Sequence, residues 1–358
     1  MERLILVPPD PATVRSILVL RLRAFGDTLL TTPTLRGLKL AYPQAKLSIL
    51  LEPSMAQVVA GLPYIDEVIS YDRLGWKKKG KWAELKGTVG MWFAIRQRHF
   101  DLVVDVLGTP RTAMLAWMSG APTRVGFGFR VRRWAYNLVW QPSSERKYIA
   151  DYTADALRAL GQQPDSLNLD FHVPTLAQSE MDAWLKAQDL SAGPKPLLVM
   201  AAGGWDLKRY PLEKMAMAVR EILDASPRPA LFLWGPGEED MAKQLVALTG
   251  KDARLAPATD FQHMGALLKR SAVLLTNDNA TKHLGVACGC PTVTIFGPTS
   301  DVAWHPPQDP KHLSVKLNLE CMPCEALTCR LGTHECLQAL EPVYVADAVL
   351  SLLQAAEC

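Results

Sequence analysis

Residues 273–298, VLLTNDNATKHLGVACGCPTVTIFGP, contain the pattern that decides the fold of this chain. The stretch opens with apolar and β-branched residues at 273–276, typical of a buried strand, and a polar turn follows. Residues 280–287 have the composition of a helix, and residues 292–296 again have that of a short buried strand. A strand, a helix and a second strand in this order predict a βαβ unit and hence a parallel sheet.

The same alternation extends through both halves of the chain. Further strands are expected at residues 16–21, 46–51, 67–71, 101–106, 167–172, 197–201 and 230–234, with helices that include 28–41, 81–97 and 177–190. Residues 191–196, SAGPKP, are the best linker candidate because Gly and Pro punctuate them. We therefore predict an α/β fold with two Rossmann-like doubly wound domains, residues 1–190 and 191–342. A final helix, residues 343–358, is expected to pack back on the first domain.

The composition of the 358 residues is that of a globular protein, with 49% hydrophobic and 21% charged residues. The formal net charge of +3 argues against a nucleic-acid-binding protein, because that class is far more basic. Residues 1–15 lack the order of positive and apolar segments that marks a signal peptide, and no long uncharged apolar stretch suggests a spanning helix. We therefore expect a cytosolic location and mostly reduced thiols.

The polar turn at 277–279 leads into the start of a helix, which is a ready site for phosphate. The first backbone N–H groups of a helix have no partner within it and carry a partial positive charge. Asn279 or Thr281 can cap this helix through a side-chain oxygen. An ordinary capped helix has the same composition, so these residues alone leave both a phosphate site and a simple cap open.

Several ordered blocks resemble the ADP-heptose lipopolysaccharide heptosyltransferases of glycosyltransferase family 9. Residues 278–287, DNATKHLGVA, followed by GCPT at 289–292 and FGPT at 296–299, are similar to the family blocks D-T/S-G-x-x-H-L-A-A-A, G-x-P-T and G-P-T. RLRAFGD at 21–27 resembles the family's opening R-x-S-x-G-D turn, and KRYP at 208–211 resembles its K-R-W-P block. The cysteine-rich tail is similar to that of the branch that adds the second heptose. Blocks in a shared order are far more specific than any one of them.

This resemblance implies a GT-B fold, with an acceptor-binding N-terminal domain and a donor-binding C-terminal domain. It implies inverting, metal-independent transfer of heptose from ADP-heptose to the inner core of lipopolysaccharide, without a cofactor. The implied partners are the ADP-sugar, a lipid A-linked core oligosaccharide and, peripherally, the surface of the inner membrane. Three alternatives stay open: a transferase for another nucleotide-sugar, a nucleotide-sugar 2-epimerase of the same architecture, and a binding protein of this fold.

Asp27 follows the first expected strand, where a strand-to-helix turn exposes side chains at the edge of the sheet. An inverting transfer needs a base that takes the proton of the acceptor hydroxyl, and the matching aspartate is the family's proposed base. The other interpretation is that Asp27 is the N-cap of the helix at 28–41. Arg23 stands where the family usually has a small hydroxyl residue, and we expect it to bind the acceptor together with Arg124 and Arg130.

The donor site implied by the resemblance lies in the C-terminal domain. Its matching positions are Lys208, Glu238, Asp278, Asn279, Ala280 and His283. Because the sequence offers no D-x-D pair for a divalent ion, we expect Lys208, the helix start at Ala280 and His283 to meet the charge of the leaving diphosphate. Asn279-Ala280 replaces the family's Thr/Ser-Gly, and an alanine with positive φ would cost about 1 kcal/mol. A shift by one residue to Glu239 stays open for the acidic position.

Two further groups of residues attract attention. Cys321, Cys324, Cys329 and Cys336 do not have a standard zinc spacing, so reduced or packed thiols are expected, with metal binding as the alternative. The segment WKKKGKW at 76–82 suits an anionic membrane surface or an acidic acceptor. A solvated loop is the alternative for this segment.

Overall fold

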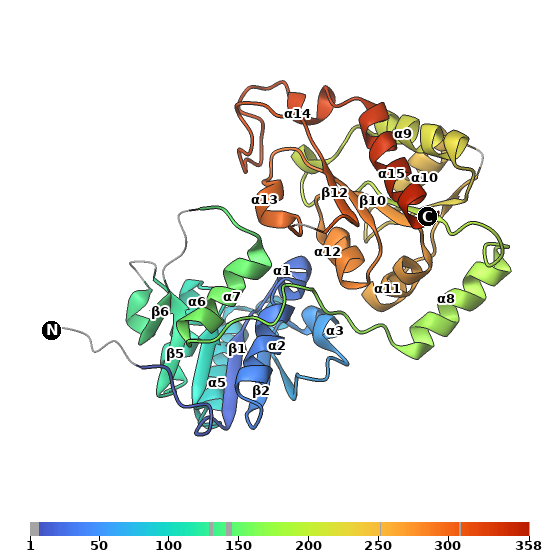
Figure 1. Ribbon diagram of the computed structural model, residues 1–358. Helices are drawn as coiled ribbons and strands as arrows, with labels where there is room; N and C mark the ends of the chain where they lie inside the picture. The colour runs from blue at the N-terminus through green and yellow to red at the C-terminus, as the bar shows by residue number, and fades with distance from the viewer. Residues whose placement is uncertain (1–6, 129–131, 141–144, 251, 308, 358) are drawn as a thin grey trace. The chain divides into compact units, whose positions relative to one another are not determined.

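The computed structural model describes residues 7–128, 132–140, 145–250, 252–307 and 309–357. The chain divides into two compact units, residues 1–172 and 173–358, called unit 1 and unit 2 below. Within the described residues, each unit contains one six-stranded sheet with parallel strands (Figure 1). Two doubly wound α/β units, as predicted, are therefore confirmed.

Unit 1 has the strand order β3-β2-β1-β4-β5-β6. The strands are β1 (Ser16–Leu20), β2 (Lys46–Leu51), β3 (Glu67–Ser70), β4 (Leu102–Asp105), β5 (Thr123–Phe127) and β6 (Leu138–Trp140). In the register of the central strands, Leu18 lies between Ser48 and Val103. These strands are buried along nearly their whole length, because helices cover both faces of such a sheet. That is why they form unbroken apolar runs in the sequence.

The helical elements of unit 1 lie on both faces of its sheet. They are α1 (Phe25–Leu29), α2 (Thr32–Ala41), η1 (Pro53–Met55), α3 (Ala56–Val59), α4 (Arg73–Lys78), α5 (Lys81–Arg96), α6 (Pro110–Met118), η2 (Arg133–Ala135) and α7 (Ile149–Ala159). Ile95 of α5 and Leu115 of α6 pack in one cluster with Leu18 of β1. On the other face α2 contacts α7, where the missing Cβ of Gly37 leaves room for Leu157.

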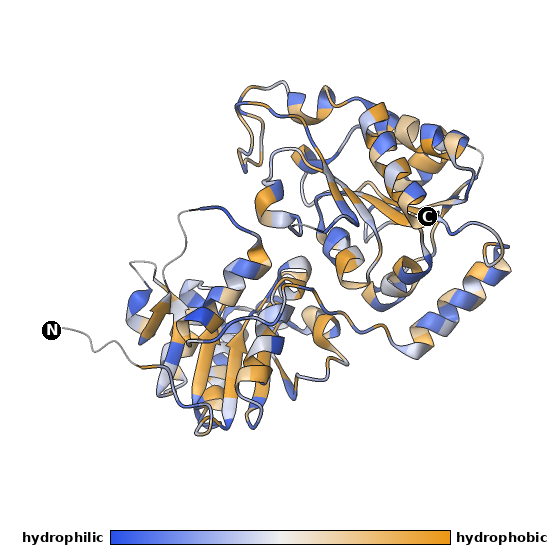
Figure 2. Cartoon of the chain, in the orientation of Figure 1, coloured by the Kyte–Doolittle hydropathy of each residue, from blue (hydrophilic) through white to orange (hydrophobic). Residues whose placement is uncertain are grey.

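Unit 2 repeats this plan with the strand order β12-β11-β10-β7-β8-β9. The strands are β7 (Leu197–Met200), β8 (Ala230–Phe232), β9 (Ala253–Leu255), β10 (Val273–Asn277), β11 (Thr292–Ile295) and β12 (His312–Val315). The helical elements are α8 (Thr175–Ala187), η3 (Asp206–Lys208), α9 (Leu212–Ala225), α10 (Glu239–Thr249), α11 (Phe261–Arg270), α12 (Ala280–Ala287), α13 (Asp301–Trp304), α14 (Glu335–Gln338) and α15 (Pro342–Glu357). Figure 2 shows apolar residues concentrated on the strands of both units.

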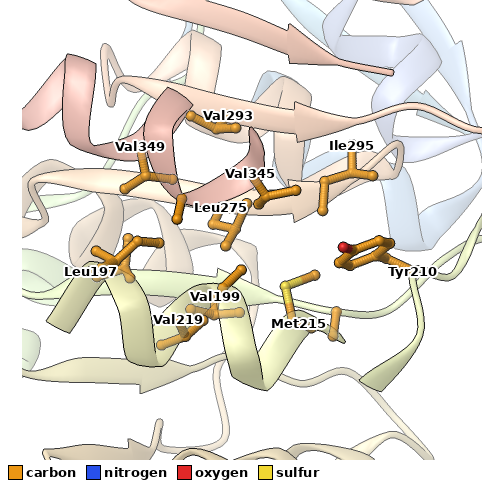
Figure 3. Close-up of a cluster of buried hydrophobic side chains, with 14 of the residues drawn as sticks. Leu197, Val199, Tyr210, Met215, Val219, Leu275, Val293, Ile295, Val345 and Val349 are labelled. Carbon is orange, nitrogen blue, oxygen red and sulfur yellow. The ribbon is translucent and has the colours of Figure 1, made fainter. Parts of the chain in front are cut away.

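The core of unit 2 lies between its sheet and the helices α9 and α15. Figure 3 shows Val199 and Leu275 of the strands close to Val219 of α9 and Val345 of α15. Helix α15 packs mainly against α9 and also contacts β10, β11 and β12. The C-terminal helix, which we expected to pack back on the first domain, thus belongs to unit 2 and uses its apolar side there. No helix in the described part of the chain is long and apolar enough to cross a membrane.

The boundary between the units also differs from the expected one at 190/191. Helix α8 belongs to unit 2, because it packs against α11 and is joined to it by ion pairs. Arg270 binds Asp182 at 2.7 Å, and His263 binds Glu180 at 2.7 Å. A Gly- and Pro-rich segment after α8 therefore lies inside a unit rather than between two.

Two expected elements differ in detail, and four observed strands were not expected. The helix expected at 28–41 is two helices, α1 and α2, because Pro33 has no N–H to donate to Leu29. The hydroxyl of Thr32 donates to that carbonyl instead, at 2.7 Å. Residues 167–172 form no strand, whereas the short strands β5, β6, β9 and β12 were not predicted. All four lie at or next to a sheet edge, and none was marked in the sequence by a longer apolar run.

Candidate functional site

The candidate residues follow the central strands of each sheet, where the order in which the chain adds strands reverses. In unit 1 the first strand β1 has the neighbours β2 and β4, and in unit 2 the first strand β7 has the neighbours β8 and β10. Ligands of doubly wound sheets bind beyond the carboxyl ends of the strands at this switch point. Asp27 follows β1, Lys208 follows β7 and Asp278 follows β10.

Asp278 is the centre of a buried ion cluster in unit 2. Its Oδ2 accepts a bond from the Nζ of Lys208 and its Oδ1 accepts one from the Nζ of Lys282, each at 2.6 Å. The hydroxyl of Thr299, in the loop after β11, donates to Oδ2 at 2.8 Å. The Lys282 side chain has no exposed surface, whereas that of Lys208 is 11% exposed. Only Lys208 therefore has a path to a ligand.

The charges of this cluster follow from its geometry. Burial on its own would raise the pKa of Asp278, but the ammonium groups of Lys282 and Lys208 outweigh burial and hold that pKa far below its ordinary value. Burial lowers the pKa of Lys282, and Asp278 opposes this shift. With both lysines protonated, the three side chains carry one net positive charge. The cluster therefore favours an anionic ligand next to Lys208.

Sequence reasoning missed Lys282 and Thr299 as members of this cluster. Lys282 lies four residues after Asp278, a spacing that brings two side chains together at a helix start. That spacing was the available signal. The contact of Thr299 joins two loops that are far apart in the sequence, so no local pattern could have shown it.

Asn279, one of the two residues expected to cap this helix, is the N-cap of α12. Its Oδ1 accepts from the backbone N–H groups of Thr281 at 2.9 Å and Lys282 at 3.3 Å. Its Nδ2 donates to the carbonyl of Ala202, in the loop after β7, at 2.8 Å. Two of the N–H groups that a phosphate would otherwise contact are therefore already bonded. Ala280 is the first helical residue, so the conformational cost feared for an alanine at this position does not arise.

His283 is buried on α12, with an exposed fraction of 3%. Burial, followed by the charge of Lys282, lowers the pKa of His283 well below its ordinary value. The imidazole is therefore neutral at pH 7, so any contribution of His283 to binding the diphosphate is a hydrogen bond rather than a charge. Its Nδ1 makes no hydrogen bond to any described residue, so this atom can form a hydrogen bond with a polar group of a ligand.

Glu238 lies in the turn between β8 and α10, at the same edge of the sheet. Its Oε2 accepts from the backbone N–H of Gly235 at 3.0 Å, which holds the carboxylate over the turn. The neighbouring Glu239 instead pairs with Lys243 along the surface of α10 at 2.8 Å. The geometry therefore favours Glu238 over Glu239 as the acidic group at the edge of the sheet.

Asp27 lies in the first turn of α1 in unit 1 and is not the N-cap of a helix. Its Oδ1 pairs with Nη2 of Arg21 at 3.0 Å, and its side chain is 31% exposed. Arg21 is buried and donates through Nη1 to the carbonyl of Val106 at 3.1 Å. The buried Asp105 carboxyl at the end of β4 also attracts the Arg21 guanidinium, and burial raises the pKa of Asp105. A fixed guanidinium thus holds the accessible carboxylate of Asp27 in one orientation.

Arg23 lines a pocket of about 230 Å³ near the ends of β1, β2 and β4. Arg73, at the start of α4, and Arg111, in α6, line the same pocket together with Glu52. Arg73 is paired with Glu84, but the guanidinium groups of Arg23 and Arg111 still outnumber the Glu52 carboxylate, so the pocket suits a ligand that carries phosphate or carboxylate groups. Sequence reasoning did not select Arg73 or Arg111, because the tertiary fold alone brings them beside Arg23.

Comparison with known proteins identifies the family. The model of glycosyltransferase family 9 (heptosyltransferase) matches residues 89–334, more than half of the chain.

The chain belongs to glycosyltransferase family 9.

Lipopolysaccharide heptosyltransferase 3 of Escherichia coli (strain K12) is 24% identical to this family 9 chain over 80% of the chain and 83% of the relative. Among solved structures, the glycosyl transferase family 9 protein of Veillonella parvula aligns with a TM-score of 0.83 at 22% identity, covering 97% of this chain and 99% of that one. The E. coli ADP-heptose lps heptosyltransferase II aligns with a TM-score of 0.76 at 18% identity, covering 96% and 100%. The GT-B fold and the glycosyltransferase class are therefore confirmed.

Two arginines that we expected to bind the acceptor, Arg124 and Arg130, are not assigned to the site of this family 9 enzyme. Arg124 donates through Nε to the carbonyl of Ala135 at 2.9 Å and through Nη1 to that of Ala121. These bonds brace the segment between β5 and β6, so we do not include Arg124 in the site proposed below. Arg130 lies outside the described residues.

The cysteine tail of the family 9 enzyme lies beside the donor-side loops. Cys321, Cys324, Cys329 and Cys336 are free thiols, and the described residues contain no group of three or more side chains arranged to hold a metal ion. Burial raises the pKa of Cys336 to about 11. His334 of this tail bonds through Nε2 to the carbonyl of Leu207, next to Lys208, at 2.8 Å. The tail thus supports the loop that carries Lys208.

Proposed function

We propose that this family 9 glycosyltransferase transfers heptose from ADP-heptose to the inner core of lipopolysaccharide, with inversion at the anomeric carbon and without a metal ion. The names of the relatives reported above supply the donor, the sugar and the class of acceptor. The observation that carries the proposal is the buried cluster of Lys208, Asp278 and Lys282, which presents one cation at the carboxyl edge of the unit 2 sheet.

In this proposal Lys208 binds the diphosphate of the donor. Its ammonium group is the more exposed cation of the cluster, and it lies 4.2 Å from the centre of the Trp205 ring. Negative charge grows on the diphosphate as the bond to the sugar breaks, so a cation placed there stabilises the transition state. The neutral His283 and the Glu238 carboxylate would bind uncharged hydroxyl or base groups of the donor.

Asp27 is the proposed base. The acceptor hydroxyl oxygen attacks the anomeric carbon, the bond between that carbon and the diphosphate oxygen breaks, and ADP leaves with the electron pair. Asp27 takes the hydroxyl proton, so one step exchanges one C–O bond for another and inverts the anomeric centre. Arg21 keeps the Asp27 carboxylate in place, and Arg23 with Arg73 and Arg111 supplies positive charge for an anionic acceptor.

The geometry of Asp278 supports metal-independent transfer. Both of its oxygens already accept bonds from lysine ammonium groups, and one also accepts from Thr299. A divalent ion at this carboxylate would have to displace a lysine and would meet the repulsion of the other. The lysines thus fill the electrostatic role that a metal ion has in many other transferases.

The test is transfer by the purified full chain with ADP-heptose and a truncated core acceptor. Asp27→Asn should lower kcat about 10²–10⁴-fold, the usual size of a general-base effect, with ADP affinity unchanged. Lys208→Met should weaken ADP binding. The control is Asp206→Asn, a substitution of a neighbouring carboxylate that is 94% exposed, which should change neither value.

Three results would overturn parts of this proposal. Full transfer by Asp27→Asn would exclude Asp27 as the base. A higher kcat/KM with another nucleotide-sugar than with ADP-heptose would replace the donor while leaving the transferase class intact. Transfer that needs added divalent ions and stops with a chelator would contradict metal independence.

A further inference from the structure

Helices α4 and α5 of unit 1 form a pair whose outer surface has no partner among the residues that the structure describes. The two helices are joined by an ion pair between Nε of Arg73 and Oε1 of Glu84 at 2.8 Å. The ring of Trp76 packs against the backbone at Gly87, where a Cβ would lie only 2.3 Å from the ring. The pair is therefore a packed element with a defined outer side.

A stripe of apolar side chains lies on the outer side of α5. Trp82 is 84% exposed, Leu85 is 52% exposed and Phe93 is 62% exposed. Together with the half-buried Val89 they follow the helical spacing of three and four residues, so they lie along one face. The inner face is already used, since Ile95 is buried in the core of unit 1. The outer stripe thus remains without a protein partner among the described residues.

Five lysines lie in the same helix pair, four of them just before the first residue of the stripe and one within it. They are Lys77, Lys78, Lys79, Lys81 and Lys86, and none of them forms an ion pair with a described residue. The two acidic residues of the segment are engaged elsewhere, because Asp72 caps α4 through the N–H of Gly75 and Glu84 pairs with Arg73. The α4–α5 surface, defined as these five lysines with Trp82, Leu85 and Phe93, is therefore both apolar and strongly basic.

We propose that the α4–α5 surface docks on a bilayer that contains anionic phospholipids. An apolar stripe flanked by lysines, with a tryptophan at its end, is the pattern of a helix lying in the membrane interface. The apolar side chains enter the boundary between headgroups and acyl chains, and the lysine stems extend to the lipid phosphates. A second copy of the chain fits less well, since self-association through this surface would bring two sets of lysines together.

Docking in this way has a consequence for the acceptor pocket. Helix α4 begins with Arg73, which also lines the pocket with Arg23 and Arg111. A docked α4–α5 pair therefore holds this pocket beside the lipid headgroups, where a lipid-linked acceptor is presented. This consequence rests on the function proposed above, whereas the docking itself does not.

The test is co-sedimentation of the full chain with vesicles of phosphatidylcholine, with and without phosphatidylglycerol, and without donor or acceptor. Binding is expected only with phosphatidylglycerol and should weaken as salt is raised. The triple variant Lys77→Gln, Lys78→Gln, Lys79→Gln should bind about 100-fold less tightly, at about fivefold per lysine. The control variant Lys186→Gln, Lys311→Gln removes exposed lysines outside the surface and should bind like the wild type.

The apolar stripe is tested separately. Trp82→Ser with Phe93→Ser should also abolish sedimentation with vesicles, whereas Leu176→Ser, at a residue of α8 that is 68% exposed, should not. In vesicles with brominated acyl chains the wild type should lose tryptophan fluorescence. Trp82→Phe should keep binding and lose most of this quenching.

Distinct results separate the possible failures. Equal binding of the triple lysine variant and the wild type, or unchanged quenching in Trp82→Phe, would overturn the docking proposal. A dimer in sedimentation velocity that disappears in Trp82→Ser with Phe93→Ser would replace the bilayer with a second copy. Vesicle binding as expected in a chain that transfers no heptose would overturn the proposed function and leave the docking surface standing.

Discussion

At the scale of single residues, the two lysines on Asp278 have different environments and therefore different roles. Lys208 and Lys282 bond the same carboxylate at the same distance, but only Lys208 is near solvent. Lys282 also lies 4.8 Å from the centre of the Phe296 ring, so its position is fixed by packing as well as by charge. We infer that Lys282 keeps Asp278 neutralised and so allows Lys208 to turn toward an anionic ligand.

Replacing Lys282 tests this division of roles. In Lys282→Met, Lys208 is the only ammonium group left on Asp278 and is held there more strongly, so ADP affinity should fall about tenfold or more. Loss of one member of a buried ion pair should also cost about 3–5 kcal/mol of folding free energy. Titration calorimetry with ADP and urea unfolding measure the two effects.

The control for this substitution is Lys243→Met on α10, which removes a lysine from an exposed ion pair with Glu239 and should change neither value. Lys282→Arg, which keeps the charge, should recover part of the ADP affinity. A folded Lys282→Met protein with wild-type ADP affinity would contradict the role assigned to Lys282.

At the scale of elements, the contact between α8 and α11 contains a pH-dependent pair. The pKa of His263 is raised, first by its hydrogen bond to Glu180 and then by that to Asp260. The native state therefore binds the proton more tightly than the unfolded chain does. The stability from this pair is fully present below the unfolded pKa of about 6.5 and is lost as pH rises through the folded value.

His263→Gln should accordingly destabilise the protein more at about pH 5.5 than at about pH 8.5, on either side of the unfolded pKa. The difference should stay below about 1 kcal/mol, because the pair is partly exposed. Urea unfolding at the two pH values measures it. The same loss at both pH values would show that His263 acts through packing alone.

Helix α12 is fitted closely to the sheet at Gly285. A Cβ there would lie 2.9 Å from Cδ2 of Leu274 and 2.9 Å from Cγ2 of Thr292, both fully buried. Gly285→Ala should therefore destabilise unit 2 by about 1–3 kcal/mol despite the better helix propensity of alanine. Gly90→Ala in α5 is the matched control, because its Cβ would meet no atom within 4 Å, and it should stabilise by up to about 1 kcal/mol. Unfolding free energies that move the same way in both variants would contradict this packing.

At the scale of the whole molecule, the candidate donor residues all belong to unit 2. Lys208, Asp278, Lys282, His283 and Thr299 lie within residues 173–358, which have their own sheet and core. The fragment 173–358 should therefore fold and bind ADP with an affinity within about tenfold of the full chain, and it should transfer no sugar. Calorimetry and circular dichroism check these outcomes. A folded fragment that does not bind ADP would show that unit 1 contributes to donor binding.

The central elements could be predicted from the sequence, because burial on both faces of a parallel strand leaves an unbroken apolar run. Residues 280–287 were expected to be a helix and are α12, and the strands from β1 to β4 were found in their places. The edge strands β6, β9 and β12 were missed, because β6 has only three residues and β9 and β12 include polar ones. The break between α1 and α2 was missed because the effect of Pro33 depends on a local side-chain bond from Thr32.

The sequence by itself determined the fold class, the family and the order of the blocks that contain Asp27, Lys208 and Asp278, because each block belongs to a local strand–turn–helix pattern. Only the tertiary structure decided which side chains meet. It placed Lys208, Lys282 and Thr299 on one carboxylate, brought Arg73 and Arg111 to the pocket of Arg23, and left the apolar outer side of α5 exposed. These contacts depend on distances between segments far apart in the chain, and the pKa values that follow from burial depend on the same packing.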